Sequence, residues 1–423
     1  MTGLRFCMIS TFYPPHNFGG DGMGIQRLSH ALARRGHEVT IVHDTDAYDM
    51  LSPRPAPPAE AEPAGITVHR LKNRLGTLSN LLTQQTGHPV VNGRRIRRIV
   101  EEGDFDVITF HNISLVGGPG LLRIGAGLKL YMAHEHWLVC PTHVLWRHGR
   151  ERCDAKECVR CVLNHRRPPQ LWRSTGMLER ELHNVDTFIA MSEFSRTKHA
   201  EFGFTRPMEV LPYFLPDLTT EEQQEPGNTV GESPHPRPFF LFVGRLEKIK
   251  GLDDVIPLFR EDIGADLLIA GDGEYGDTLR ELGGGLDRVH FLGRIHPDEL
   301  ARYYAHAKAL IVPSVCFETF GIILIESFRQ GTPVIARRLG PFPEIVEKAG
   351  AGALFETDDE LRLAMARFVD DDGYRDRLGK AGREAFSAHW SESAVVPQYL
   401  DIVARSAEAR GMTSLLDKLE AVH

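Results

Sequence analysis

Residues 309–328 read ALIVPSVCFETFGIILIESF, and this stretch indicates the fold class of the chain. An apolar strand pattern ends near Ser314, a short loop follows, and after Gly321 apolar residues point to all sides of a predicted helix. A buried strand followed by a buried helix is typical of a parallel α/β sheet. Because such sheets bind ligands beyond the carboxyl ends of their strands, the loop between Ser314 and Gly321 is a candidate binding site.

The same alternation extends in both directions along the chain. Apolar strand patterns occur in the second half at 239–243, 267–270, 289–292, 309–313 and 333–336, and in the first half at 4–10, 38–43, 106–111, 129–133 and 187–191. A single hydrophobic core rarely grows beyond about 250–300 residues, so the 423 residues are expected to form two α/β domains. We expect one domain over residues 1–215 and the other over 239–389, because residues 216–238 are polar and proline-rich and are typical of a linker.

The composition is that of an ordinary globular protein, with 42% hydrophobic and 25% charged residues. The net charge of -8 gives no reason to expect a nucleic-acid partner. Because no apolar stretch is long enough for a membrane span and the first residues lack a signal-peptide pattern, a cytoplasmic protein is expected. One basic cluster leaves two interpretations open, a solvated helix face or a peripheral membrane contact. It consists of Arg94, Arg95, Arg97 and Arg98.

Basic residues follow the first strand of the predicted second domain. Gly244 allows a sharp turn after this strand, and Arg245 and Lys250 then lie near the carboxyl end, where anions bind. A guanidinium can hold two phosphate oxygens, and an ammonium adds a compact positive charge. The pattern therefore indicates either a phosphate site or an ordinary solvated basic loop.

Two glutamates, Glu318 and Glu326, stand eight positions apart around the start of the predicted helix. Phe320 and Gly321 lie where this helix begins, and the free N–H groups of a helix N-terminus hold anions. Glu326 lies on the buried helix, where a carboxylate needs a partner. That partner is either a ribose hydroxyl of a bound nucleotide or a neighbouring Arg or Lys.

Arg294 and Ile295 directly follow another strand, at 289–292. Backbone groups in such a position can form hydrogen bonds with the edge of a nucleotide base.

Taken together, these segments resemble the retaining GT-B glycosyltransferases of family 4. The second half matches in the family's order and spacing through GRLEKIKG (244–251), LLIAGDGE (267–274), FLGRIHPDEL (291–300), ALIVPSVCFETFG (309–321) and GTPVIARRLGPFPEIV (331–346). The first half is similar through the Gly19-Gly20 loop and AHEHWLVCP (133–141). The resemblance implies a GT-B fold, with two Rossmann-like domains whose parallel sheets face each other across a cleft. It also suggests that the last helices, about 390–423, pack back on the first domain.

The resemblance implies roles for the residues of the second domain. Arg245 and Lys250 would hold the diphosphate of a nucleotide-sugar donor. Glu318 would bind hydroxyls of the donor sugar, with the backbone N–H groups of Phe320 and Gly321 nearby. Glu326 would bind the ribose.

In the first domain, the resemblance implies that Gly19 and Gly20 approach the donor and that His134 reaches the donor sugar. The position of His134 supports this role independently, because it directly follows the strand at 129–133. His111 and His136 are weaker candidates for the same role.

The implied activity is transfer of a sugar, with retention of configuration, from a nucleotide-diphosphate donor to an unknown acceptor. The resemblance favours UDP over GDP, and the acceptor is a saccharide, a lipid-linked molecule or a small molecule. No cofactor is expected for transfer, because basic residues can take the place of a metal. Two alternatives stay open: a GT-B sugar-nucleotide epimerase or phosphorylase, and a non-catalytic Cys-rich binding protein.

The glycine-rich segment GGDGMG (19–24) lacks the G-x-G-x-x-G spacing of a dinucleotide site, which disfavours a dehydrogenase.

Four cysteines lie in a short basic segment with the spacing C-x12-C-x4-C-x2-C. The final Cys-x2-Cys is a good zinc half-site, and four thiolates suit tetrahedral zinc. A structural zinc, a redox-labile or iron–sulfur site and unliganded thiols all stay open at this point, as do His143, His148 and His165 as replacement ligands. The four candidates are Cys140, Cys153, Cys158 and Cys161.

Overall fold

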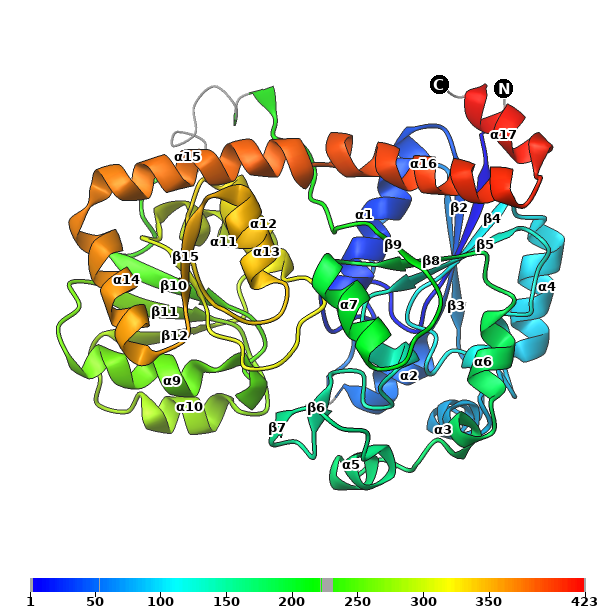
Figure 1. Cartoon of the computed structure of the whole chain (residues 1–423), viewed down its shortest axis with the longest axis horizontal. Helices are drawn as coiled ribbons and strands as arrows, with labels where there is room; N and C mark the ends of the chain where they lie inside the picture. The colour runs from blue at the N-terminus through cyan, green and yellow to red at the C-terminus, as the bar shows by residue number, and fades with distance from the viewer. Residues whose placement is uncertain (1–2, 53, 221, 223–230, 422–423) are drawn as a thin grey trace. The chain divides into compact units, whose positions relative to one another are not determined.

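The computed structural model describes all residues except 1–2, 53, 221, 223–230 and 422–423, and it divides the chain into two compact units (Figure 1). The first unit comprises Met1–Tyr213 and Val395–His423, and the second comprises Phe214–Ala394. Each unit has its own parallel sheet, so the expected fold class of two Rossmann-like α/β units is confirmed. Among the described helices, none combines the length and the apolar character needed to cross a bilayer.

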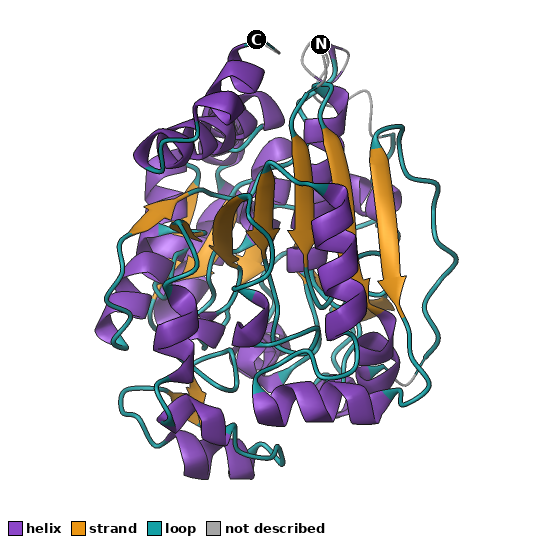
Figure 2. Cartoon of the chain, turned by 90° about the vertical axis from the view of Figure 1, so that its right-hand side faces the viewer, coloured by secondary structure: helices purple, strands orange, loops and turns teal. Residues whose placement is uncertain are grey.

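Seven parallel strands form the sheet of the first unit, and Figure 2 shows them as a row of arrows with helices packed over them. Their order is β3-β2-β1-β4-β5-β8-β9, so the strand order reverses between β1 and β4. A ligand crevice is expected beyond the carboxyl ends of the strands at such a reversal. The strands are β1 (Arg5–Ile9), β2 (Glu38–Asp44), β3 (Ile66–Leu71), β4 (Val107–Phe110), β5 (Leu128–Ala133), β8 (Thr187–Ala190) and β9 (Met208–Val210).

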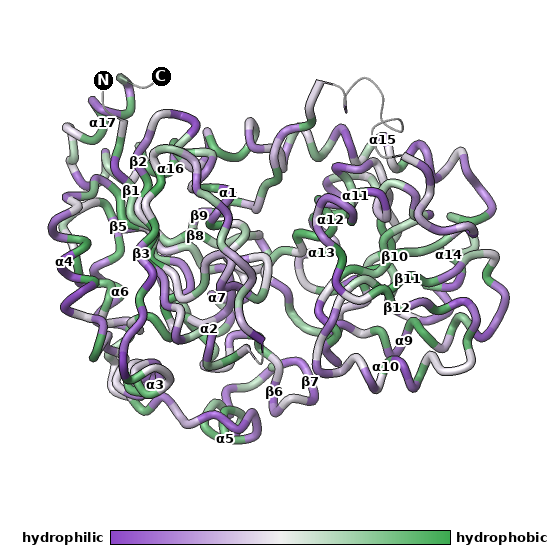
Figure 3. The backbone as a smooth tube through the Cα atoms, turned by 180° about the vertical axis from the view of Figure 1, so that it is seen from behind, coloured by the Kyte–Doolittle hydropathy of each residue, from purple (hydrophilic) through white to green (hydrophobic). Residues whose placement is uncertain are grey.

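Helices of the first unit pack apolar residues into the core beside this sheet. In α4, for example, Ile96 and Val100 are buried whereas the four arginines of the basic cluster are exposed, and the tube of α4 alternates between purple and green (Figure 3). A small hairpin, β6 (Trp146–Arg147) with β7 (Glu151–Arg152), lies outside the main sheet. The helices are α1 (Gly20–Arg34), α2 (Thr45–Leu51), α3 (Thr77–Thr86), α4 (Gly93–Gly103), α5 (Cys158–Asn164), α6 (Met177–Leu182) and α7 (Glu193–Glu201).

Six parallel strands form the sheet of the second unit, in the order β12-β11-β10-β13-β14-β15. The central strands are fully apolar, as expected for a sheet that is covered on both faces. The strands are β10 (Phe239–Val243), β11 (Asp266–Ala270), β12 (Val289–Gly293), β13 (Leu310–Val312), β14 (Val334–Arg337) and β15 (Gly352–Phe355). The helices are α9 (Leu252–Val255), α10 (Gly276–Leu282), α11 (Pro297–His306), α12 (Ile322–Arg329), α13 (Phe342–Ala349), α14 (Asp358–Asp370) and α15 (Asp372–His389).

The C-terminal helices α16 (Glu392–Ala409) and α17 (Thr413–Glu420) contact the first unit from Val395 onward. The Tyr399 hydroxyl lies 3.0 Å from Thr109 Oγ1 of β4. Lys418 Nζ donates to Asp106 Oδ1 over 2.6 Å, beside the start of the same strand. These polar contacts tie the end of the chain to the first sheet.

The predicted linker at 216–238 is wrong in its described part, because the second unit begins at Phe214. Arg329 Nε donates to the carbonyl of Pro216 over 3.2 Å, and His235 Nε2 lies 2.7 Å from Asp266 Oδ2. Backbone carbonyls and a histidine in this polar segment thus pair with charged residues of the second unit. Composition alone does not reveal such contacts. Residues 221 and 223–230 of the predicted linker lie outside the described residues.

The glycine-rich segment 19–24 was expected to be a loop, but α1 already begins at Gly20. The glycines permit close packing at the start of this helix. A Cβ atom on Gly24 would lie 2.4 Å from a ring carbon of Tyr213, and one on Gly22 would lie 2.6 Å from the Asn17 side chain. The glycines therefore mark tight contacts rather than a break in the helix.

Besides the two short hairpin strands β6 and β7, three strands of the main sheets were not predicted from the sequence: β3, β9 and β15. They lie at the edges of the two sheets, where one flank is open and only part of each strand is buried. The resulting patterns, such as ITVHRL in β3, are short and mixed and lack the continuous apolar run of a central strand.

Candidate active site

The loops after β10, β11 and β12 lie side by side at the carboxyl edge of the second sheet. The Gly244 N–H donates to the Ala270 carbonyl over 3.1 Å, and the Gly271 N–H donates to the Gly293 carbonyl over 2.7 Å. A Cβ atom on Gly271 would lie 1.8 Å from the Gly244 carbonyl oxygen, so only glycine fits there. The backbone thus continues the sheet for one more residue and holds the basic loop after β10 against its neighbours.

The loops after β10 and β13 bring Lys250 and Glu318 together. Lys250 Nζ lies 2.6 Å from Glu318 Oε1, and the Ser314 hydroxyl donates to the same oxygen over 3.2 Å. The two loops are also joined by the Val315 N–H, which donates to the Ile249 carbonyl over 2.9 Å. Lys250 and Glu318 belong to two different sequence motifs that were predicted to form one site, and the structure joins them in an ion pair.

The environment keeps both groups charged. Burial alone would lower the pKa of Lys250, but the nearby Glu318 carboxylate more than offsets this and the pKa is raised. Burial likewise acts to raise the pKa of Glu318, and the charge and hydrogen bond of Lys250 bring it below its ordinary value. The edge therefore presents a fixed ammonium and a fixed carboxylate at neutral pH.

Arg245 differs from Lys250 in being half exposed. Its side chain retains 55% of its accessible surface, and Nη1 lies 2.6 Å from Glu247 Oε1. An exposed ion pair of this kind contributes little to stability, so the guanidinium can exchange its partner for an anion at small cost.

Gly321 sits at the N-cap of α12 with φ of +115°. A Cβ atom there would lie 2.8 Å from the ring of Phe342, so both the backbone angle and the packing require glycine. Phe320 beside it is buried. One turn into the helix, Glu326 Oε2 accepts a hydrogen bond from the Tyr304 hydroxyl over 2.9 Å. This carboxylate thus has a tyrosine of α11 as a partner, which sequence reasoning did not foresee.

Arg294 and Ile295 follow β12 directly, Arg294 exposed and Ile295 partly buried. They adjoin Gly293, whose carbonyl binds Gly271. The structure therefore brings together at one edge Gly244, Arg245, Lys250, Arg294, Ile295, Glu318, Phe320, Gly321 and Glu326.

The carboxyl edge of the first sheet carries a row of three rings, of which two are buried and one is partly buried. His134 Nε2 lies 2.8 Å from His111 Nδ1, and His134 Nδ1 lies 2.5 Å from the Tyr213 hydroxyl. Burial lowers the pKa of His134 to about 3, so its imidazole is neutral at physiological pH. The row includes Tyr213, which the sequence analysis missed because β9 before it has only three residues.

Gly19 and Gly20 form the start of α1 in the same unit. Gly19 is the N-cap residue, and its carbonyl accepts a hydrogen bond from Asn17 Nδ2 over 2.6 Å. The ring of Tyr213 packs against Gly24 in the second turn of this helix and also contacts His134. Tyr213 therefore connects the start of α1 with the histidine row.

The four cysteines of the basic segment line one small cavity in the first unit. All four are free thiols, with Cys140 and Cys161 buried and the other two partly buried. The three histidines considered as replacement ligands do not line this cavity.

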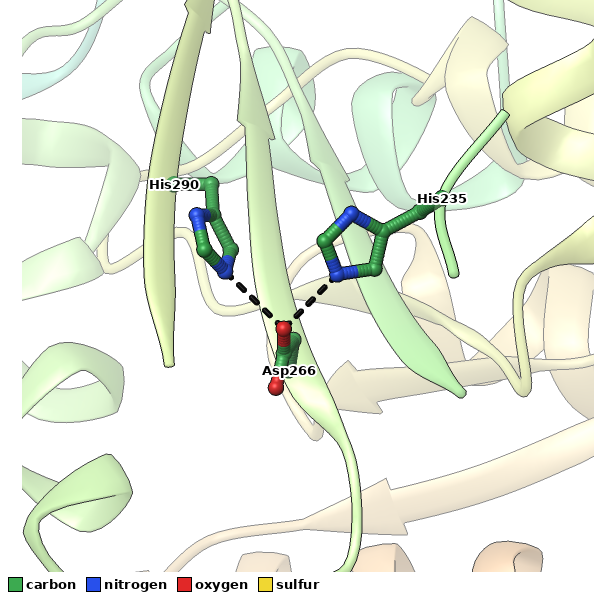
Figure 4. A group of neighbouring side chains, drawn as sticks. All are labelled: His235, Asp266 and His290. Atoms are coloured by element: carbon green, nitrogen blue, oxygen red, sulfur yellow. Dashed lines mark hydrogen bonds and ion pairs between the residues drawn. The ribbon is translucent and has the colours of Figure 1, made fainter. Parts of the chain in front are cut away.

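A separate cluster lies at the amino end of the second sheet, where His235 and His290 both point toward Asp266 (Figure 4). The Nε2 atoms lie 2.7 and 2.9 Å from the same carboxylate oxygen. Arg237 Nη2 lies 2.8 Å from that oxygen as well. Because a guanidinium already neutralises the carboxylate, the cluster fits a structural ion-pair network better than a cation site.

Two family models match the chain. Residues 18–215 match "Glycosyltransferase Family 4", and residues 227–385 match "Glycosyl transferases group 1". Together they leave out only the two ends of the chain and residues 216–226.

Individual relatives cover the full chain. A GDP-mannose-dependent alpha-(1-6)-phosphatidylinositol monomannoside mannosyltransferase of Mycobacterium tuberculosis is 29% identical over 96% of this chain and 100% of its own. Sucrose-phosphate synthase from Thermosynechococcus elongatus has a similar structure, with a TM-score of 0.71 at 20% identity over 96% of this chain and 100% of its own. Anabaena HepE, solved with UDP and glucose, has a TM-score of 0.63 at 18% identity over 95% and 100%. These findings show that the chain is a glycosyltransferase with the GT-B fold and that it belongs to glycosyltransferase family 4.

Proposed function

We propose that the chain transfers a sugar from a nucleoside-diphosphate donor to a hydroxyl acceptor with retention of the anomeric configuration. The observation that carries this proposal is the Lys250–Glu318 pair, 2.6 Å apart at the carboxyl edge of the second sheet. A fixed cation suits a diphosphate, and a fixed carboxylate beside it suits the hydroxyl groups of a sugar.

The diphosphate is proposed to bind between Lys250, Arg245 and the start of α12. Arg245 can leave Glu247 to bind phosphate oxygens, since its side chain is half exposed. The N-terminal N–H groups of α12 carry a positive partial charge that adds to these two cations. With this much positive charge supplied by the protein, transfer is proposed to need no metal ion.

The carboxylates are proposed to position the rest of the donor. Glu318 accepts hydrogen bonds from hydroxyls of the donor sugar, and Glu326 accepts from the ribose. The Tyr304 hydroxyl already occupies one oxygen of Glu326 and holds its side chain in place. The backbone of Arg294 and Ile295 is proposed to contact the base.

In the reaction, the acceptor oxygen forms a bond with the anomeric carbon as the bond from that carbon to the diphosphate breaks. The leaving diphosphate takes the acceptor proton on the same face of the sugar, which accounts for retention. Negative charge grows on the leaving group, and preorganised cations stabilise it most in the transition state. From the first unit, His134, Gly19 and Gly20 are proposed to contact the donor sugar.

The base of the donor has two candidates. The family resemblance and the UDP in the HepE structure favour UDP, whereas the GDP-mannose dependence of the mycobacterial relative favours GDP-mannose. The acceptor is proposed to be a saccharide, a lipid-linked molecule or a small molecule, with specificity from loops of the first unit.

A peripheral contact with an anionic membrane is proposed through α4. Its four arginines are exposed while its apolar residues are buried in the core, so the outer face is strongly basic. Binding to vesicles that contain anionic lipid should weaken roughly 30-fold in an Arg94→Gln, Arg95→Gln variant, since each basic residue near such a surface contributes about 1 kcal/mol. Equal binding of the variant would contradict this contact.

The activity is tested by incubating the purified chain with UDP-sugars and GDP-sugars, with and without a metal chelator. The expected result is release of free nucleoside diphosphate from one donor class, unaffected by the chelator, and a product of unchanged anomeric configuration by NMR. Donor interconversion without release of nucleoside diphosphate would instead indicate an epimerase. Release of a sugar 1-phosphate only in the presence of inorganic phosphate would indicate a phosphorylase.

A further inference from the structure

We propose that Cys140, Cys153, Cys158 and Cys161 together bind one structural zinc ion in the first unit. The four thiols come from three separate places in the chain, yet they line the same cavity. The cavity measures about 20 Å³, which is room for one ion or one water molecule but not for an organic ligand. Four sulfurs around a space of this size fit a tetrahedral zinc site.

The secondary structure around the cavity brings the cysteines together. Cys158 is the first residue of α5 and Cys161 lies one turn later, so both thiols are on one side of the helix. Cys153 directly follows the β6–β7 hairpin, and its N–H donates to the Leu145 carbonyl over 2.8 Å. Cys140 enters from the loop after β5, and its N–H donates to the His136 carbonyl over 2.8 Å.

The surroundings of the thiols suit thiolate ligands. The backbone N–H of His148 donates to Cys161 Sγ over 3.2 Å, a contact that stabilises negative charge on sulfur. A bound zinc ion deprotonates its thiol ligands.

Nearby histidines have other partners, which leaves the ligand set to the cysteines. His143 Nδ1 lies 2.7 Å from Glu135, His148 Nε2 lies 3.0 Å from Glu157, and His165 Nε2 lies 3.1 Å from the Trp146 carbonyl.

The segment that carries the four cysteines also needs a stabilising interaction beyond the packing of its apolar residues. Val159 and Leu163 of α5 are more than half exposed, so this helix has little core of its own. His143, Leu145 and His148 nevertheless all have positive φ angles, which cost free energy in non-glycine residues. A metal ion is one of the supports that small, weakly packed segments use.

Binding requires the cysteine side chains to turn into the cavity. In the described part of the chain, the ligand atoms of His235, Asp266 and His290 already lie within 4.8 Å of one another. Arg237, however, already neutralises the carboxylate of Asp266. All four cysteines already line the cavity, and rotation about their Cα–Cβ bonds is the movement that we propose for binding.

The zinc ion would fix the loop that carries His134. Cys140 lies six residues after His134, and the intervening loop is closed by the His136 N–H, which donates to the His143 carbonyl over 3.0 Å. The Glu135–His143 ion pair closes the same loop. This positioning role rests on the proposed function of His134, whereas zinc binding itself does not.

The test is metal analysis of the full chain purified without chelators. We expect about one zinc per chain in the wild type, and loss of nearly all of it in Cys153→Ser and in Cys161→Ser. Cys7→Ala is the matched control, because Cys7 is a buried thiol of β1 outside the cavity, and it should keep its zinc. Absence of zinc from the wild type, bound iron instead, or disulfides among the four cysteines by mass spectrometry would overturn the proposal.

A second measurement uses the wild type and therefore still tests the site if the cysteine variants fail to fold. Cobalt exchanged into the intact wild type should give the visible absorption of tetrahedral thiolate-bound cobalt, and an absent band would contradict the site. Removal of zinc from the folded wild type should leave the Kd for nucleoside diphosphate unchanged but lower kcat by up to about 100-fold, as expected when a catalytic group shifts. An unchanged kcat would refute the positioning role without affecting the test of the transferase activity.

Discussion

The carboxyl edges of the two sheets are built from the same topology but carry opposite kinds of chemistry. The edge of the second sheet holds a charged pair, Lys250 and Glu318, whose pKa values both favour the ionised forms. The edge of the first sheet holds neutral rings, and burial lowers the pKa of His134 and raises that of Tyr213. The difference suggests a division of work in which the second unit binds the anionic diphosphate and the first unit contacts uncharged hydroxyl groups.

The largest effect is expected from the charged edge. Glu318→Gln keeps the shape of the side chain but removes its charge, so kcat should fall by about 10²–10³-fold, or roughly 3–4 kcal/mol. Steady-state kinetics with the identified donor measure this. Glu347→Gln is the control, because Glu347 forms an exposed ion pair with Arg338 in the same unit and should be active as wild type. Equal activity of Glu318→Gln and Glu347→Gln would contradict a special role of the charged edge in catalysis.

A substitution at the amino end of the second sheet should lower stability instead of catalytic activity. Asp266 is fully buried among His235, His290 and Arg237, so Asp266→Asn should destabilise the second unit by about 3 kcal/mol. Burial acts to raise the pKa of Asp266, but its hydrogen bonds lower it below the ordinary value. Its stabilisation is therefore present above about pH 4 and lost as the pH falls through the folded pKa.

Urea unfolding of the two proteins at pH 7 and at low pH measures this difference. The free energies of unfolding should differ at pH 7 and converge at low pH. A constant difference at both pH values would show that the carboxylate is not the cause.

The neutral edge should give a smaller, pH-independent effect. His134→Ala should lower kcat by about 10- to 100-fold, the scale of one or two lost hydrogen bonds in an active site. Because the pKa of His134 is lowered to about 3, the ratio of wild-type to variant kcat should stay constant between about pH 5 and 8. A step in that ratio near pH 6.5 would show that the imidazole titrates and is not neutral.

Removal of the Tyr213 hydroxyl should have the smallest effect. Tyr213→Phe removes one contact to His134, worth about 1 kcal/mol, so kcat should fall roughly fivefold. Tyr399→Phe loses a similar buried contact, to Thr109 of β4. Tyr399→Phe is the control and should lose stability but keep its kcat. An equal loss of kcat in Tyr213→Phe and Tyr399→Phe would show that general destabilisation causes the effect.

The fold and the positions of most site residues could be predicted because they depend on local patterns. Central strands such as β10 are continuous apolar runs, and Arg245, Lys250 and Glu318 directly follow such runs. The contact between Lys250 and Glu318 could not be predicted, since 68 positions separate them and the register of two loops decides their distance. Tyr304 and Tyr213 were missed for the same reason, because each contacts a candidate residue of its own unit, Glu326 and His134 respectively, through tertiary packing.

The central claim is that the carboxyl edge of the second sheet binds a nucleoside diphosphate through Lys250. Isothermal titration of UDP and GDP into the wild type and Lys250→Met, each with and without a chelator, tests it directly. We predict micromolar binding of one nucleotide by the wild type, independent of chelator, and an affinity at least about tenfold weaker in the variant, as expected for loss of a hydrogen bond to a charged group. Equal affinity of both proteins, or no binding of either nucleotide, would contradict the account.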